Sequence, residues 1–191
     1  MIHGGFQMIE LLSYEKMNTH TFDCWTFENV ISNEVLKQVI WDGDIFHWGV
    51  IEGMRTDKNY RIWMNKYASS SFQHICKTFD DATTKRMFGD IVGCDYSQCR
   101  TRIELCKDEK GSWLHNHFDD KAKLFTLQLY LSDSDISTSF NNSTTGAKNG
   151  SGWFFKNTGS ELHGLPKLNK RRISIIVNYV DDTWRDSSVL V

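Results

Sequence analysis

The chain has 191 residues, 40% of them hydrophobic, which is enough for one domain with a sizeable core. Its 22 basic and 24 acidic residues give a formal net charge of −2, so nothing attracts it to nucleic acid or to an anionic membrane. We therefore expect neither partner. The aromatic content of 13% favours a filled core and an aromatic-lined pocket over a disordered chain.

The cysteines and the start of the chain indicate a reduced, cytoplasmic setting. There is no run of 18 apolar residues, so we expect no transmembrane helix. Residues 1–10 lack the basic start and long apolar stretch of a secretory signal. An odd number of cysteines without C-x-x-C spacing favours free thiols over a disulfide framework. These cysteines are Cys24, Cys76, Cys94, Cys99 and Cys106.

Three stretches in the first half have the hydrophobic spacing of helices. Ser32 can cap the first helix, which we expect to end just before Gly43. A second helical stretch begins near Ser71, and a third ends at Gly93. The apolar residues of the three stretches are Val35, Leu36, Val39 and Ile40; Phe72, Ile75, Cys76 and Phe79; and Met87, Phe88, Ile91 and Val92.

From about residue 100 the hydrophobic period changes to two, which predicts strands. We expect strands at 100–106, 124–131, 153–155 and 172–180. The polar stretch 132–152 is rich in Ser, Thr, Asn and Gly and is predicted to be a loop. Such a loop is either a lid beside a site or a plain surface connection.

The strands at 124–131 and 172–180 each have one apolar and one polar face. The polar faces carry Thr126, Gln128 and Tyr130, and Arg172, Ser174, Ile176 and Asn178. Helices followed by strands predict an α+β protein that is mainly β. In a closed or sandwich-like sheet a polar face lines a cavity, whereas in an open sheet it meets water, and the pattern leaves both open.

The residues that carry the most chemistry are two histidines and an aspartate. His117 and Asp119 are two apart in an extended segment, so both side chains can reach one ion. His163 adds a third ligand, and Arg172-Ile-Ser174 begins nine residues after it. Two imidazoles and one carboxylate form a facial triad that leaves positions on Fe(II) open for a co-substrate and dioxygen. Arg172 and Ser174 point the same way and can hold a carboxylate.

This order of residues resembles the 2-oxoglutarate and Fe(II)-dependent dioxygenases, and above all their prolyl-4-hydroxylase-like branch. The matching segments are Trp113-Leu-His-Asn-His-Phe-Asp119, 124–132, 155–166 and 171–179. The resemblance implies one domain over residues 1–191. Its double-stranded β-helix (a cupin-like jelly-roll) would occupy about 97–185, with supporting helices in about 1–95. The family's usual Gly-Gly-x-Leu segment is missing, and Ser137-Thr-Ser-Phe140 stands in that region.

The resemblance also implies roles for single residues. His117, Asp119 and His163 would bind Fe(II), and the carboxylate of Asp119 favours hydroxylation over halogenation. The residues implied to hold the distal carboxylate of 2-oxoglutarate are Arg172, Ser174 and Tyr130. The implied reaction uses O2 to hydroxylate an unactivated C–H bond of a small-molecule or peptidyl substrate, with release of succinate and CO2.

Several neighbouring residues are alternatives. His115 competes with His117, which the family's Trp-Leu-x-x-His-x-Asp spacing favours. Asp120 is a weaker alternative carboxylate, because it would point to the other side of the strand. Arg171 lacks a serine two residues later, which favours Arg172.

Three further sets of residues have weaker interpretations. A zinc site would use Cys94, Cys99, Cys106 and His115, but the spacing does not match a zinc knuckle. Cavity cations for an anionic substrate would be Arg100 and Arg102, although an ion-paired strand face with Glu104 is the more ordinary reading. Candidates for a substrate wall are Arg61 and Trp63.

Two other functions fit the same metal residues. One is a cupin-like module that binds a metal or small ligand without turnover, and the other is a metal-dependent hydrolase or isomerase on the same barrel. A non-catalytic module needs no carboxylate anchor beyond the metal, so Arg172 with a cavity-facing Tyr130 would favour the dioxygenase. A hydrolase would hold its metal with more ligands and would not consume 2-oxoglutarate.

Overall fold

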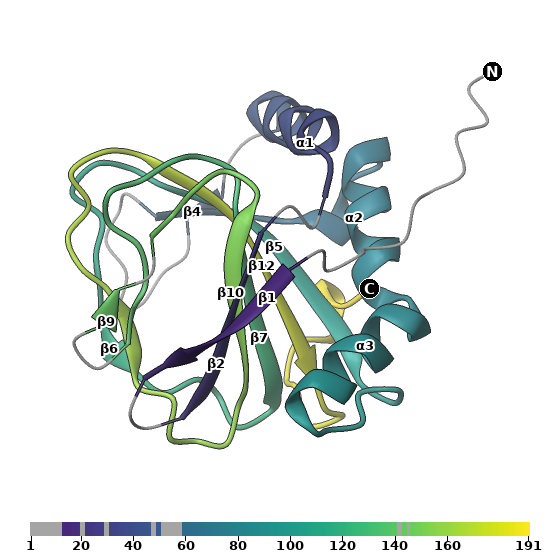
Figure 1. The fold of residues 1–191 in the computed structure, drawn as a ribbon. Helices are drawn as coiled ribbons and strands as arrows, with labels where there is room; N and C mark the ends of the chain where they lie inside the picture. Colours follow the sequence, from purple (N-terminus) through teal and green to yellow (C-terminus); the bar gives the residue numbers. More distant parts are fainter. Residues whose placement is uncertain are drawn as a thin grey trace.

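Two antiparallel β-sheets face each other, and three helices cover the outer face of the larger one (Figure 1). The computed structural model describes residues 13–19, 22–28, 31–46, 49–50, 59–140, 143–144 and 146–191. In spatial order, the eight-stranded sheet consists of β1 (Ser13–Asn18), β2 (Asp23–Glu28), β10 (Ser151–Lys156), β7 (Lys123–Tyr130), β12 (Arg172–Val180), β5 (Arg100–Asp108), β4 (Asn59–Trp63) and β3 (Gly49–Val50). The four-stranded sheet consists of β6 (Leu114–His117), β11 (His163–Leu165), β8 (Ser139–Phe140) and β9 (Ser143–Thr144). This is the predicted jelly-roll with supporting helices.

The middle strands of the large sheet are buried on both faces. Strand β12 pairs antiparallel with β5 along its whole length and with β7 up to a register shift between Tyr179 and Val180, so the alternating residues of the three strands form two common layers. One layer is apolar and packs against the helices; it includes Leu127, Leu129, Ile175, Val177, Ile103 and Leu105. The other layer is polar and points into the jelly-roll; its buried members include Thr126, Gln128, Ser174, Asn178 and Glu104. The polar faces therefore line an interior and do not meet water.

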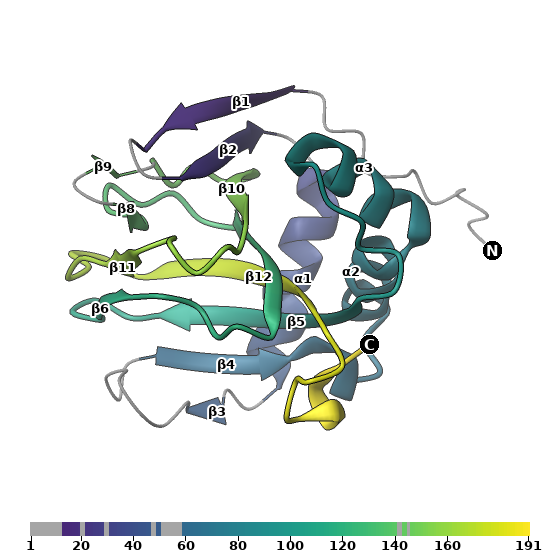
Figure 2. The ribbon, with the colours of Figure 1, turned by 90° about the horizontal axis from the view of Figure 1, so that it is seen from below.

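The three helices are α1 (Asn33–Ile45), α2 (Ser70–Asp80) and α3 (Ala82–Val92). Their N-caps are Ser32, Ser69 and Asp81, whose side-chain oxygens accept backbone N–H bonds of the first turn. Figure 2 shows all three helices on the same side of the large sheet. Within the described residues, no helix combines the length and apolar character that crossing a bilayer requires.

The end of α1 differs from the prediction. Gly43 does not lie past the helix but inside it, and the helix continues to Ile45. The carboxylate of Asp42 accepts hydrogen bonds from the hydroxyls of Ser69 and Ser71 at the start of α2. We attribute the extra helical turn to these contacts, because tertiary contacts override the weak helix propensity of one glycine.

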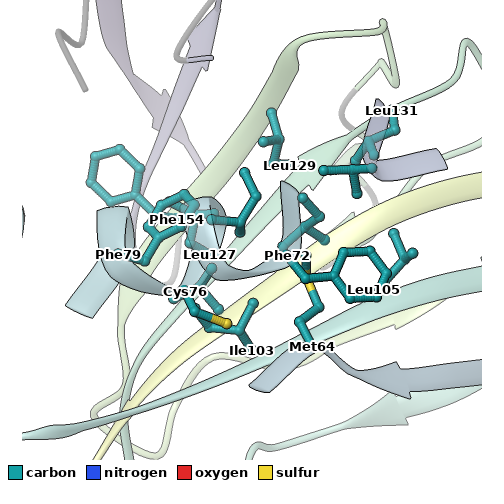
Figure 3. Close-up of a cluster of buried hydrophobic side chains, with 14 of the residues drawn as sticks. Met64, Phe72, Cys76, Phe79, Ile103, Leu105, Leu127, Leu129, Leu131 and Phe154 are labelled. Atoms are coloured by element: carbon teal, nitrogen blue, oxygen red, sulfur yellow. The ribbon is translucent and has the colours of Figure 1, made fainter. Parts of the chain in front are cut away.

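The apolar layer of the sheet and the helices share one core. Figure 3 shows Phe72 and Phe79 of α2 in one cluster with Leu127 of β7 and Phe154 of β10. The ring of Phe88 from α3 lies 5.1 Å from that of Phe154, edge to face. This core packs the helices against the outer face of the large sheet and so fixes the backbone that carries the inner, polar layer.

The first 95 residues are less helical than predicted. Strands β1, β2 and β4 join the large sheet, and β4 brings Arg61 beside β5. The predicted loop at 132–152 contains the two-residue strands β8 and β9 and a bridge between Ser134 and Ala147. Strands this short carry no readable hydrophobic period, which is why the pattern missed them.

Gly93 ends α3 in the left-handed conformation, with φ 68° and ψ 49°. A Cβ added there would meet no atom within 4 Å, so the cost of Gly93→Ala comes from the backbone conformation alone. We expect the free energy of unfolding to fall by about 1 kcal/mol in urea titrations. Gly146→Ala is the matched control, because Gly146 is equally open but has no positive φ. Equal effects in the two variants would contradict the prediction.

Candidate metal centre

The structure brings His117, Asp119 and His163 together. His117 ends β6 and His163 begins β11, and the two residues are register partners in the small sheet. Asp119 follows β6 by two residues. One ligand atom from each of the three side chains lies within 4.8 Å of the others. Among the described residues this is the one such group of three or more His, Cys, Asp or Glu side chains.

Backbone carbonyls orient both imidazole rings. Nδ1 of His117 lies 3.0 Å from the carbonyl oxygen of His115, and Nδ1 of His163 lies 2.8 Å from that of Glu161. A carbonyl only accepts, so each Nδ1 carries the proton and each Nε2 keeps a lone pair. Burial lowers the pKa of His163, which favours the neutral ring that a metal requires.

The carboxylate of Asp119 is held ionised. Its oxygens accept hydrogen bonds from the ammonium of Lys123 (2.6 Å) and the hydroxyl of Thr126 (2.7 Å). Burial raises the pKa of Asp119, but the Lys123 charge and these bonds more than offset it and hold the pKa well below its usual range. The group is therefore an anionic oxygen donor at neutral pH.

A tight turn fixes the approach to His163. The buried carboxylate of Glu161 accepts five hydrogen bonds, from backbone and hydroxyl donors of Thr158 and Ser160 and from the Gly159 amide. The same residue supplies the carbonyl that orients the His163 ring. The aromatic side chains packed around that ring are Phe155, Trp153 and Phe140, with centroids 5.4, 6.2 and 6.1 Å away.

The metal residues share a cavity with two arginines. His117, Asp119 and His163 line one part of it, and Arg61 of β4 and Arg172 of β12 line another. Nη2 of Arg172 donates to a carboxylate oxygen of Asp108 over 2.7 Å. Nε and Nη1 of Arg172 have no hydrogen-bond partner among the described residues, although the side chain is only 5% exposed.

This donor set fits Fe(II) and a 2-oxo acid with a second carboxylate. Two neutral imidazoles and one carboxylate leave open coordination positions, as oxygen-activating iron sites require. Unpartnered guanidinium donors in a buried cavity fit an anionic group. The residues that would hold a metal are therefore His117, Asp119 and His163, and Arg172 lines the same cavity.

Ser174 and Tyr130 are buried beside the cavity but are not among the residues that line it. Ser174 Oγ accepts from Gln128 Nε2 (2.9 Å), and the Tyr130 hydroxyl accepts from Trp153 Nε1 (2.8 Å). That Ser174 and Tyr130 contact the 2-oxoglutarate carboxylate stays a prediction. In the structure their hydroxyls hydrogen-bond Gln128 and Trp153, and these two side chains line the cavity. Tyr130 lies on the inner face of β7, as expected, and Cζ of Arg172 lies 5.8 Å from the centroid of its ring.

The sequence analysis missed Asp108, Asn59, Lys123 and Gln128 as site residues. Asp108 lies two residues past the predicted strand end and on the same strand face as Glu104. Extending the alternation by one step would have found it. Arg61 was named only as a possible substrate wall, and no local signal joins it to Arg172.

The alternative ligands lie elsewhere. His115 is exposed and its ring contacts Trp113, Asp120 is exposed, and so is Arg171. The described cysteines form no metal cluster with His115. Of the two predicted cavity cations, Arg100 is exposed. Arg102 pairs with Glu104 and Asn178, and its guanidinium lies over the rings of Trp63 and Trp184.

No family model and no curated protein matches the sequence. Solved structures do match the fold. A prolyl-4-hydroxylase from Pseudomonas putida is 10% identical with a TM-score of 0.69, over 85% of this chain and 95% of that one. A prolyl hydroxylase from Trichoplax adhaerens, in complex with a hypoxia-inducible-factor oxygen degradation domain peptide fragment, is 14% identical with a TM-score of 0.64, over 83% and 84%. HygX from Streptomyces hygroscopicus, with nickel and 2-oxoglutarate bound, is 13% identical with a TM-score of 0.62, over 86% and 85%. The chain therefore has the prolyl-4-hydroxylase-like jelly-roll fold.

Glu161→Gln tests the turn before His163. The amide nitrogen of Gln would face donors where Glu161 offers an acceptor. We expect affinity for Mn(II), measured by calorimetry, to fall about tenfold, and the free energy of unfolding to fall by about 1–3 kcal/mol. Asp135→Asn is the control, because Asp135 is exposed and pairs with Lys170 at the surface. Unchanged metal affinity in Glu161→Gln would count against the turn's role.

Proposed function

We propose that this chain, as one domain over residues 1–191, is a 2-oxoglutarate- and Fe(II)-dependent oxygenase that hydroxylates an unactivated C–H bond. The observation that carries the proposal is the placement of two unlike groups in one cavity. His117, Asp119 and His163 form the candidate metal site, and Arg172 presents unpartnered donors to the same space.

The histidines and the aspartate would hold the iron. Each imidazole is held by its Nδ1 proton, so its Nε2 lone pair is fixed in direction before the metal arrives. Asp119 supplies one negative charge, and Thr126 keeps its carboxylate in place from the large sheet. Iron(II) with a bound 2-oxo acid supplies the activation of O2, coupled to loss of CO2, formation of succinate and oxidation of the substrate.

Arg172 would bind the distal carboxylate of 2-oxoglutarate. Its guanidinium is buried, and Asp108 fixes one nitrogen and leaves two without partners. A bound carboxylate would accept hydrogen bonds from these donors and would add a negative charge beside the buried guanidinium. Because Arg172 and the metal residues line one cavity, a molecule with a chelating end and an anionic end fits between them.

The surroundings would keep water from the reacting centre. Trp153 lines the cavity, and Phe155 and Phe140 pack around the His163 ring. An apolar wall beside the metal limits solvent access and strengthens the electrostatic contacts inside.

Arg172 favours this function over the alternatives. A metal-binding module without turnover, or a hydrolase with a fuller set of ligands, gives no reason to bury a guanidinium with free donors in the metal cavity. The HygX structure contains 2-oxoglutarate with nickel, and the Trichoplax enzyme contains a peptide, so we propose a small-molecule or peptidyl substrate.

Asp119→Ala should abolish metal binding. Wild-type protein titrated anaerobically with Fe(II) and 2-oxoglutarate should develop a weak visible charge-transfer band near about 500 nm, as a keto acid chelated to ferrous iron gives when positions are open. The band should be absent from Asp119→Ala, while Asp120→Ala, the exposed neighbour, should keep it. If the wild-type protein binds iron but shows no charge-transfer band with 2-oxoglutarate, the proposed function is wrong.

Arg172→Ala should weaken the binding of 2-oxoglutarate and leave metal binding unchanged. Loss of the buried charge partner should cost roughly 2–5 kcal/mol of co-substrate binding. The measurement is the 2-oxoglutarate concentration that half-saturates the same band. Arg171→Ala is the control, because Arg171 is exposed. Equal half-saturation in both variants would rule out Arg172 as the anchor.

A further inference from the structure

One buried carboxylate is shared by two arginines. Oδ1 of Asp108 accepts from Nη1 of Arg61 over 2.8 Å and from Nδ2 of Asn59 over 2.7 Å. Oδ2 accepts from Nη2 of Arg172 over 2.7 Å. The side chains of Asp108, Arg61 and Arg172 are 0%, 4% and 5% exposed, so water screens none of these charges well.

The cluster has an unbalanced positive charge. Among the described residues, three buried guanidiniums (Arg61, Arg102 and Arg172) share two buried carboxylates (Asp108 and Glu104), and the Glu104 charge acts on Arg61 as well as on Arg102. A surplus buried charge is costly unless an opposite charge joins it. Within the part of the chain that the structure describes, both arginines keep donors without a hydrogen-bond partner: Nε of Arg61, and Nε and Nη1 of Arg172.

Asp108 lies behind the arginines as seen from the cavity. Arg61 and Arg172 line the cavity, whereas Asp108 is not among its lining residues. The strands explain this arrangement. Asp108 of β5 is the register partner of Asn59 on β4 and of Arg172 on β12, and Arg61 is two residues further along the same face of β4. The carboxylate is thus central and the two guanidiniums flank it.

We propose that Arg61 is a second guanidinium of the co-substrate site, binding the distal carboxylate together with Arg172, and that Asp108 is the positioning residue that aims both. This inference rests on the proposed function and deepens it. One added carboxylate would balance the surplus charge and use the free donors. The site would therefore bind a 2-oxo diacid more tightly than a 2-oxo monoacid. The two arginines that make this distinction come from β4 and β12, which are distant in sequence.

Arg61→Met tests the role of Arg61 by binding alone. The Mn(II)-loaded protein is titrated without oxygen, by calorimetry, with 2-oxoglutarate and with 2-oxopentanoate. The second compound chelates in the same way and has a methyl group in place of the distal carboxylate. Wild type should prefer the diacid strongly. Arg61→Met should lower that preference by roughly tenfold to a hundredfold, since one charge-assisted contact is lost.

Two further variants separate binding from folding. Arg61→Lys keeps the charge beside Asp108 but loses the fork, so it should fold and still lower the preference measurably. Lys85→Met is the matched control, because Lys85 is a buried cation that pairs with Asp80 and does not line the cavity. It should lower the melting temperature and leave the preference unchanged.

Asp108→Asn tests the positioning role. The substitution should weaken the binding of 2-oxoglutarate, because Asp108 orients the arginines that meet the distal carboxylate. The affinity for 2-oxopentanoate, which has no distal carboxylate, should stay nearly unchanged. A wild-type preference that persists in both Arg61 variants would overturn the inference while leaving the proposed function standing. No diacid preference in the wild type would overturn both.

Discussion

The burial of both faces of the large sheet is the constraint on which the rest of the structure depends. The outer faces of β7, β12 and β5 are covered by the helices, and the inner faces are enclosed by the small sheet. Several buried polar side chains on the inner faces therefore hydrogen-bond one another. Gln128 joins Ser174 to Thr138, and Asn178 joins Arg102 to Thr126. A one-residue slip in register would exchange the two faces, so this network also fixes the strand pairing.

The candidate metal site depends on both sheets at once. The small sheet aligns His117 with His163, and backbone carbonyls of the preceding residues turn the two rings toward a common point. The large sheet contributes Thr126, which holds Asp119. Geometry of this kind is set by rigid backbone and does not rely on long flexible side chains, which suits a centre whose ligands must be in place before the metal binds.

Charge in the cavity is divided between two places. At the metal end, Asp119 is balanced by Lys123; at the other end, Asp108 is shared by two guanidiniums and leaves a positive surplus. Burial keeps both sets of charges strong, because solvent does not screen them. The cavity therefore has one end with candidate metal ligands, where the carboxylate is paired with Lys123, and one end with surplus positive charge. A ligand that spans both ends is oriented by charge as well as by shape.

The sequence by itself determined the long strands and the three side chains that the structure gathers into the candidate metal site. Alternation over eight or nine residues is a local signal, and the spacing of His117 and Asp119 puts both side chains on one side of an extended segment. The short strands β6, β8, β9 and β11 were unreadable, because two to four residues carry no period. Only the tertiary structure placed Arg61 beside Asp108, 47 residues away, and turned the Tyr130 hydroxyl toward Trp153. Both depend on which strands become neighbours, and that is decided by the packing of the whole sheet, which no local pattern contains.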